Sequence, residues 1–308
     1  MNVLVIASFN QGCFAPFILE QAKALGHHGC MVDFFGLQGK GVIGYLKNLP
    51  GLKRKIKAFC PDVIHAHYGL SGLLANLQGQ VPVVTTYHGS DINDKRVLPF
   101  SKMAIRLSAW NVFVSRKTME IVRPKRSFTL LPCGVDFSEM QLMEKTVARQ
   151  NMRLAADKRY ILFAGAFDNA VKNAPLAKQA VEALQDDNAE LLELKSYSRE
   201  EVTQLMCAAD AFLMTSFSEG SPQVIKEALA CGCPIVSVDV GDVKERVEGL
   251  EGCYVAETRD PQALAQLLQK AMTLKGKTRG RERLVSDGLD NKFVAQELIR
   301  IYERVVKK

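Results

Sequence analysis

The sequence predicts an α/β protein made of two doubly wound parallel-sheet domains, and three observations support this fold class. Short apolar segments alternate with amphipathic segments along most of the 308 residues, as strands and crossover helices do in parallel sheets. A polar stretch over residues 138–158 interrupts the alternation, which then begins again. The length is also comfortable for two domains.

The first half opens with an apolar strand over residues 3–8. We expect the next helix to begin at Gly12, because apolar residues recur at helical spacing after it. Further strands are expected at residues 30–35, 62–65, 81–86, 111–115 and 128–131. Strands separated by helices pair in parallel through right-handed crossovers, so these segments predict one open sheet.

The second half repeats this order, with strands expected at residues 160–164, 190–194, 211–215 and 234–238. Two of its helices carry start signals. Ser198 and Glu201 form a capping box, and Asp260 stands directly before Pro261.

The domain boundaries follow from this repetition. We expect an N-terminal domain over residues 1–140 and a second domain over residues 141–290. A last amphipathic helix, over residues 291–308, is expected to return to the N-terminal domain.

Composition and charge indicate a folded globular protein and suggest which partners it could bind. Hydrophobic residues make up 47% and charged residues 24%, the values of a folded globular chain. The formal net charge of +7 suits anionic partners such as nucleotides or a membrane face, although it also serves solubility alone. We expect no nucleic-acid partner.

The compartment is expected to be the cytoplasm. No apolar run approaches the ~20 residues that a membrane helix needs. The eight cysteines lie mostly in apolar runs, which predicts buried free thiols in a reducing compartment. Cys231 and Cys233 have no second pair at zinc-binding spacing, so we expect no metal site.

The segment from Glu219 to Glu227 follows the predicted strand at 211–215. Ser221 is placed to cap a helix and Pro222 fits its first turn, so the helix would begin at the carboxyl end of a parallel strand. Open α/β sheets bind ligands there, and helix amides favour a phosphate. Glu227 would lie roughly 9 Å further along the helix axis, so the two carboxylates suit different ends of one nucleotide sugar. A capped helix with a solvated glutamate is the alternative.

The stretch from Ser218 to Val236, with seven residues between its two glutamates, resembles the donor-site motif of the retaining family-4 glycosyltransferases. Other segments resemble the same family: Asp62–His67, Thr86–Asp91, Leu131–Asp136, and Gly165–Asp168 with Lys172–Asn173. The resemblance implies the GT-B architecture, two Rossmann-like domains facing a central cleft. It further implies sugar transfer with retention from a nucleoside-diphosphate sugar to a glycan or lipid-linked acceptor, in cell-surface polysaccharide or lipopolysaccharide synthesis.

The resemblance also implies roles for single residues. The expected catalytic residues are Glu219, Lys172 and His88, and the expected donor-binding residues are Glu227, Gly220, Ser221, Gly12 and Gly165. Glu227 would accept hydrogen bonds from the ribose diol, and Glu219 would hold the sugar hydroxyls. Lys172 and the amides near Gly220, Ser221 and Gly12 would stabilise the leaving diphosphate in place of a metal. No resident cofactor is expected, because the nucleotide sugar is a co-substrate.

Two departures from the family pattern leave alternatives open. Ala166 stands where the family usually has an arginine, and Cys133 replaces the usual asparagine. The loss of the arginine would weaken neutralisation of the diphosphate. A catalytically impaired nucleotide-sugar binding protein, or a nucleotide-sugar epimerase on the same architecture, therefore remains as an alternative.

Residues 45–57 interleave five basic residues with apolar ones. Such a segment would suit peripheral contact with the anionic inner face of a membrane. An ordinary amphipathic helix with its charges in water is the alternative.

Overall fold

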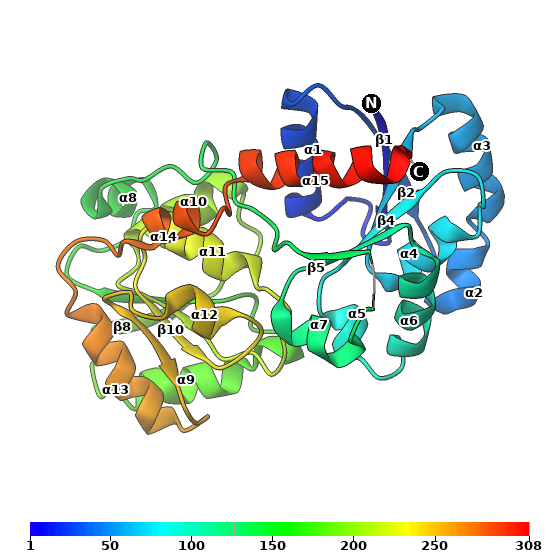
Figure 1. The fold of residues 1–308 in the computed structure, drawn as a ribbon. Coiled ribbons are helices and arrows are strands. Elements are labelled where there is room, and N and C mark those ends of the chain that lie inside the picture. Colours follow the sequence, from blue (N-terminus) through cyan, green and yellow to red (C-terminus); the bar gives the residue numbers. More distant parts are fainter. Residues whose placement is uncertain (126, 308) are drawn as a thin grey trace. The chain divides into compact units, whose positions relative to one another are not determined.

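The structure is a computed structural model that describes residues 1–125 and 127–307. It divides into two units, one made of Met1–Gly134 with Asn291–Lys308 and the other of Val135–Asp290 (Figure 1). The first unit thus ends at Gly134 rather than at residue 140. The reason is local, because the Val135 amide donates to the Leu289 carbonyl at 2.9 Å and Val135 packs into the core of the second unit.

The first unit contains a six-stranded parallel sheet in the order β2-β1-β3-β4-β5-β6. Its strands are β1 Asn2–Ser8, β2 Met31–Leu37, β3 Val63–His67, β4 Val83–Tyr87, β5 Trp110–Phe113 and β6 Phe128–Leu130. Its helices are α1 Pro16–His27, α2 Gly41–Leu46, α3 Leu49–Phe59, α4 Gly69–Asn76, α5 Ser90–Asn93, α6 Leu98–Leu107, α7 Arg116–Val122 and α15 Asn291–Val306. All six predicted strands are present, each within about two residues of its expected ends.

Two helix layers cover this sheet. Apolar side chains of α1 and α15 pack on one face, with Leu25 and Leu298 among those buried there. Leu52 of α3 and Leu74 of α4 pack on the other face. The last helix therefore completes the core of the first unit, where it lies beside α1 (Figure 1).

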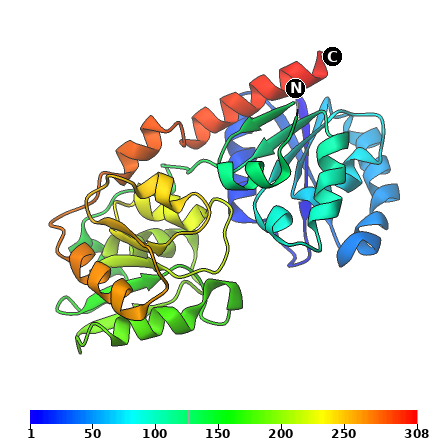
Figure 2. The same cartoon turned by 60° about the horizontal axis from the view of Figure 1, so that its bottom comes forward.

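The second unit contains a five-stranded parallel sheet in the order β11-β10-β9-β7-β8. Its strands are β7 Arg159–Phe163, β8 Ala189–Leu192, β9 Ala211–Met214, β10 Ile235–Val238 and β11 Cys253–Ala256. Its helices are α8 Lys145–Asn151, the 3-10 turn η1 Ala170–Lys172, α9 Ala174–Glu182, α10 Arg199–Ala208, α11 Gln223–Ala230, α12 Val243–Val247, α13 Pro261–Met272 and α14 Gly280–Ser286. Figure 2 shows α9 and α13, in green and orange, together on one side of this sheet.

Helix starts in the second unit follow the sequence signals. The capping box of α10 is complete, since the Ser198 hydroxyl and the Glu201 carboxylate each accept from the other residue's amide. The Asp260 carboxylate likewise caps α13. The edge strand β11 was not predicted.

Both sheets change winding direction at one point. In the first unit β1 lies between β2 and β3, and in the second β7 lies between β8 and β9. Loops on the two sides of such a switch point diverge at the carboxyl ends of the strands and leave room for a ligand. These two switch points are where a site is to be sought.

The structure also bears on the predictions about the cysteines and about membrane-spanning helices. The eight cysteines, all in the described part of the chain, are free thiols. Five of them are buried, but Cys13 and Cys60 are exposed, so the expectation of burial fails at those two positions. No helix within residues 1–125 and 127–307 is long and apolar enough to cross a membrane.

Candidate functional site

Lys172 and Glu219 meet at the switch point of the second unit. The Lys172 ammonium lies 2.7 Å from Glu219 Oε1, and both side chains are largely shielded from water. Lys172 follows β7 and Glu219 follows β9, and these two strands are neighbours in the sheet. The structure thus brings together the two expected catalytic residues of this unit.

The loops that carry this ion pair are tied to each other. The Thr215 hydroxyl, which follows β9, lies 2.9 Å from the carbonyl oxygens of Lys172 and Asn173. The Phe217 amide donates to the Val171 carbonyl at 2.9 Å. Because both loops are held at several points, the position of the ion pair is set before any ligand binds.

Gly165 leaves space for the Lys172 side chain because it has no side chain of its own. A Cβ at Gly165, where φ is +153°, would lie 3.0 Å from Cγ of Lys172. A larger residue would displace the lysine stem, so the glycine allows Lys172 to cross the loop. Its neighbour Ala166 is half-buried and contributes no charge.

The Glu227 side chain is buried in α11 and accepts a hydrogen bond from an arginine that had no predicted role. Arg199 Nη1 donates to Glu227 Oε1 at 2.9 Å. The complete capping box at Ser198 fixes the start of α10, so Arg199 is the first residue of that helix. The signal was available, because a basic residue opening a capped helix after β8 must stand at the carboxyl edge of the sheet.

The expected cap of α11 is wrong. The N-cap residue is Pro222, which makes no side-chain cap hydrogen bond. The Ser221 hydroxyl instead bonds to Asp242 Oδ2 at 2.8 Å, and Arg246 holds the same oxygen at 3.0 Å. Ser221 therefore fixes the loop before α11 and does not cap the helix.

Close backbone packing restrains Gly220. A Cβ at Gly241 would lie only 2.4 Å from the Gly220 carbonyl oxygen. Arg259 is a second arginine that had no predicted role. It donates to the carbonyl oxygens of Thr215 and Ser216 at 2.9 and 2.8 Å. These contacts hold the loop that carries Glu219 on both sides.

His88 lies at the carboxyl end of β4 in the first unit. His67 Nδ1 lies 3.0 Å from His88 Nε2, and the His88 ring packs against the rings of Tyr68 and Phe17. Burial, reinforced by the neighbouring His65 and His88, holds the pKa of His67 well below its usual value. His67 is therefore neutral.

The proton position on this histidine pair follows from burial. His67 Nε2 is buried and has no hydrogen-bond partner among the described residues. A buried acceptor without a partner is better tolerated than a buried N–H without one. This favours the tautomer of His67 that carries its proton on Nδ1, and His67 Nδ1 then donates to His88 Nε2. In the neutral form of His88 the ring proton is then on Nδ1, the nitrogen that faces Cys133.

Asp91 holds the two loops around His88 in place. Its carboxylate accepts from the amides of His88, Gly89 and Gly69 at 3.0, 2.9 and 2.9 Å. Burial raises the pKa of Asp91 to about 6, although the three amides act in the opposite direction. Sequence reasoning found this segment by resemblance but gave Asp91 no role.

Gly12 departs from its expected role. It adopts φ +74° in a turn, and α1 begins four residues later, at Pro16. The Gly12 amide donates to the Phe9 carbonyl at 3.1 Å, so in this structure it is used within the loop rather than offered to a diphosphate.

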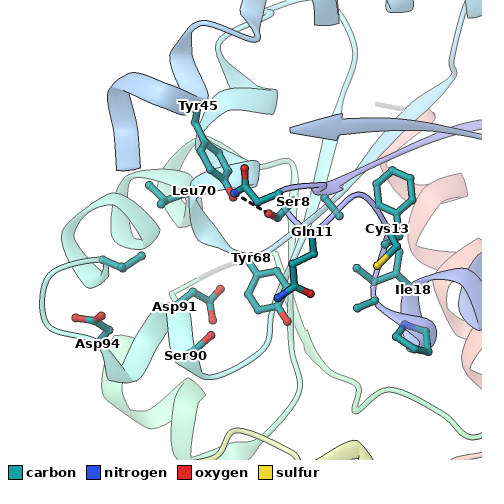
Figure 3. Close-up of a pocket in the computed structure, with 16 residues that line it drawn as sticks. Ser8, Gln11, Cys13, Ile18, Tyr45, Tyr68, Leu70, Ser90, Asp91 and Asp94 are labelled. Atoms are coloured by element: carbon teal, nitrogen blue, oxygen red, sulfur yellow. Dashed lines mark hydrogen bonds between the residues drawn. The ribbon is translucent and has the colours of Figure 1, made fainter. Parts of the chain in front are cut away.

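The loops at the switch point of the first unit enclose a pocket of about 630 Å³ (Figure 3). Ser8 ends β1 and Gln11 follows it, Tyr68 directly follows β3, and Asp91 belongs to α5, which follows β4. Tyr45 of α2 closes one side. Among the described residues that line it there is no lysine or arginine, and the lining carboxylates are Asp91 and Asp94.

Two family models match the chain. The model described as "Glycosyltransferase Family 4" matches residues 14–139, and the one described as "Glycosyl transferases group 1" matches residues 173–273. A putative teichuronic acid biosynthesis glycosyltransferase, TuaC of Bacillus subtilis (strain 168), is 28% identical over 239 residues. That match covers 68% of this chain and 61% of the length of TuaC.

Solved structures share the fold. Sucrose-phosphate synthase from Thermosynechococcus elongatus superposes with a TM-score of 0.80 at 18% identity, over 99% of this chain and 98% of that one. Anabaena HepE in complex with UDP-glucose gives a TM-score of 0.70 at 17% identity, over the full length of both chains. With a family model matched in each unit and the GT-B fold throughout, the chain belongs to the family-4, group 1 glycosyltransferases.

Proposed function

We propose that the protein is a metal-independent glycosyltransferase that moves a sugar from a nucleoside-diphosphate sugar to a glycan or lipid-linked acceptor, with retention. The observation that carries the proposal is the Lys172–Glu219 pair at a switch point. It places a cation for a leaving diphosphate beside a carboxylate for sugar hydroxyls. The similarity to TuaC supports a role in polysaccharide synthesis.

We assign binding of the nucleotide-sugar donor to the second unit. The N-terminal end of the α11 dipole and the Lys172 ammonium favour the diphosphate. Glu227 accepts the ribose hydroxyls, with Arg199 orienting its carboxylate. As the new bond forms, the leaving phosphate takes the proton of the acceptor hydroxyl. No resident cofactor takes part.

The test of the function is donor turnover with and without acceptor. A thermal-shift screen of nucleoside diphosphates identifies the donor base, since a ligand at 100 times its Kd stabilises by ~2.7 kcal/mol. The matching nucleotide sugars are then assayed with glycan acceptors, and the anomeric configuration of the product is read by NMR. Turnover without acceptor would indicate an epimerase, and binding without turnover would indicate the impaired binding protein.

Metal independence gives a separate prediction. Transfer is expected to persist in excess EDTA, because Lys172 and helix amides take the place of a cation at the diphosphate. The measurement is the initial rate before and after chelation and after return of magnesium or manganese. Activity that disappears with EDTA and returns with either ion would contradict the proposed donor site.

The pocket of the first unit suits the acceptor. Its described lining offers hydroxyl, amide and carboxylate groups but no lysine or arginine, so it favours an uncharged sugar over a phosphorylated one. Tyr68 and Tyr45 offer aromatic faces to a sugar ring.

Gln11 provides the test of this pocket. Gln11→Ala is expected to raise KM for the acceptor about 3- to 10-fold, the effect of one lost hydrogen bond, with donor affinity unchanged. Gln266→Ala, an exposed glutamine on α13, is the matched control. A change in donor Kd instead of acceptor KM would move Gln11 to the donor site.

A further inference from the structure

Three cysteines of the second unit gather at the amino edge of its sheet. Cys207 lies in the last turn of α10, before β9, and Cys231 and Cys233 stand between α11 and β10. All three line a pocket of about 210 Å³. The proposed donor site lies at the carboxyl edge of the same sheet, so this cluster is separate from it.

Cys207 and Cys231 are in direct contact. The Cys231 thiol donates a hydrogen bond to the Cys207 sulfur, and the Cys207 thiol in turn lies 3.7 Å from the Gln141 carbonyl oxygen. The helices that lead to the two cysteines, α10 and α11, are neighbours in this unit (Figure 1). Two sulfurs that share a hydrogen bond need only a short approach to form a disulfide.

The surroundings of Cys207 favour its thiolate. The hydrogen bond from Cys231 is the main cause that lowers the pKa of Cys207. The positive charges of Lys277 and Arg281 and the Met143 amide act in the same direction, against the effect of burial. The Lys277 ammonium also donates to the Cys231 carbonyl oxygen at 3.2 Å, which holds it beside the pair. Because the thiolate is the nucleophilic form of cysteine, Cys207 is the reactive member of the cluster.

The other two thiols of the cluster keep their protons. The hydrogen bond to Cys207 and burial together raise the pKa of Cys231, and burial raises the pKa of Cys233. Within residues 1–125 and 127–307 no three His, Cys, Asp or Glu side chains are placed to hold a metal ion, so we consider the cluster as a set of nucleophiles. Cys233 lines the same pocket as Cys207 and therefore serves as an internal comparison.

The pocket admits only small reactants. Cys207 and Cys231 are 4% and 0% exposed, so the pocket is their route to solvent. Its volume is several times the ~30 Å³ that a water molecule occupies in the liquid, which leaves room for a hydroperoxide. Of the other charged residues that line it, Lys145 pairs with Asp210 at 2.5 Å and Glu144 is exposed.

We propose that Cys207 is oxidised by a small hydroperoxide and that Cys231 then converts the product to a disulfide. The Cys207 thiolate attacks one oxygen of the hydroperoxide, so that an S–O bond forms, the O–O bond breaks and the leaving oxygen takes a proton. The Cys231 sulfur then attacks the Cys207 sulfur, so that the S–S bond forms and water leaves with the Cys231 proton. The two thiols lose two electrons, and the hydroperoxide is reduced to an alcohol or water.

The experiment treats the full chain with hydrogen peroxide, blocks the remaining thiols with N-ethylmaleimide in denaturant and maps unreduced peptides by mass spectrometry. Wild type is expected to yield a linked peptide pair that contains Cys207 and Cys231 and has lost two hydrogen atoms. Cys233 should be recovered as its maleimide adduct. Cys207 is expected to lose its thiol about tenfold or more faster than Cys233, because only Cys207 is held as a thiolate.

Two variants separate the steps. Cys231→Ala should stop at a sulfenic acid on Cys207 that dimedone traps, and Cys207→Ala should leave Cys231 as a thiol. The matched control Cys233→Ala should form the wild-type disulfide. A link from Cys207 to Cys233, or a Cys207 that stays a thiol after the exposed Cys13 and Cys60 are oxidised, would overturn the proposal. The wild-type peptide map decides this even where a variant does not fold.

Discussion

Replacing Lys172 with alanine is expected to lower kcat about 10²- to 10³-fold, the range for removing a group that stabilises charge developing on a leaving group. The lysine stands 2.7 Å from Glu219 in tied loops, so it needs no reorganisation as the diphosphate departs. The measurement is the transfer rate at saturating donor and acceptor. Lys195→Ala is the matched control, because Lys195 also pairs with a carboxylate of this unit, Asp168, but in an exposed position.

A double-mutant cycle separates two roles for Lys172. If it acts only by positioning Glu219, the double variant Lys172→Ala/Glu219→Ala will be no slower than Glu219→Ala alone. We expect the double variant to be slower than either single variant, since in the proposed reaction Lys172 contacts the diphosphate and Glu219 contacts the sugar. A kcat for Lys172→Ala within a few-fold of wild type would remove the lysine from the mechanism.

Much of the fold could be predicted from local pattern. Buried parallel strands appear in the sequence as apolar runs, and the capping box at Ser198 and the proline at Pro261 mark where two helices begin. The edge strand β11 was not predicted because Cys253–Ala256 is an apolar run of only four residues. The domain boundary was placed late because the polar run after residue 138 packs as part of the second unit, with Met140 and Ala148 in its core.

The candidate site was predictable in its residues but less so in its contacts. Resemblance identified Lys172, Glu219 and Glu227, and the order of the strands explains why the first two meet. Spacing along the chain carries no information on Ser221, whose hydroxyl turns to Asp242, 21 residues away, instead of capping its own helix. The position of Arg199 at the carboxyl edge of the sheet could be predicted from its capped helix, but its bond to Glu227 could not, because that partner is 28 residues distant.

Replacing Glu227 with alanine is expected to weaken binding of the nucleoside diphosphate by about 1.5–3 kcal/mol, the range for hydrogen bonds to a charged group. That is roughly a 10- to 150-fold rise in Kd. The carboxylate is buried and held by Arg199, so its orientation is fixed before the proposed contact with the ribose diol forms. Calorimetric titration measures the effect directly.

Arg199 makes this prediction specific. Arg199→Ala keeps the carboxylate but leaves it without its partner, so we expect a smaller loss of affinity than with Glu227→Ala. A deoxyribose analogue of the nucleotide supplies the decisive comparison. If Glu227 binds the diol, wild type should discriminate strongly against the 2′-deoxy nucleotide and Glu227→Ala should discriminate little, because its acceptor is already gone. Equal discrimination by both proteins would place Glu227 in a structural role, as the partner of Arg199 alone.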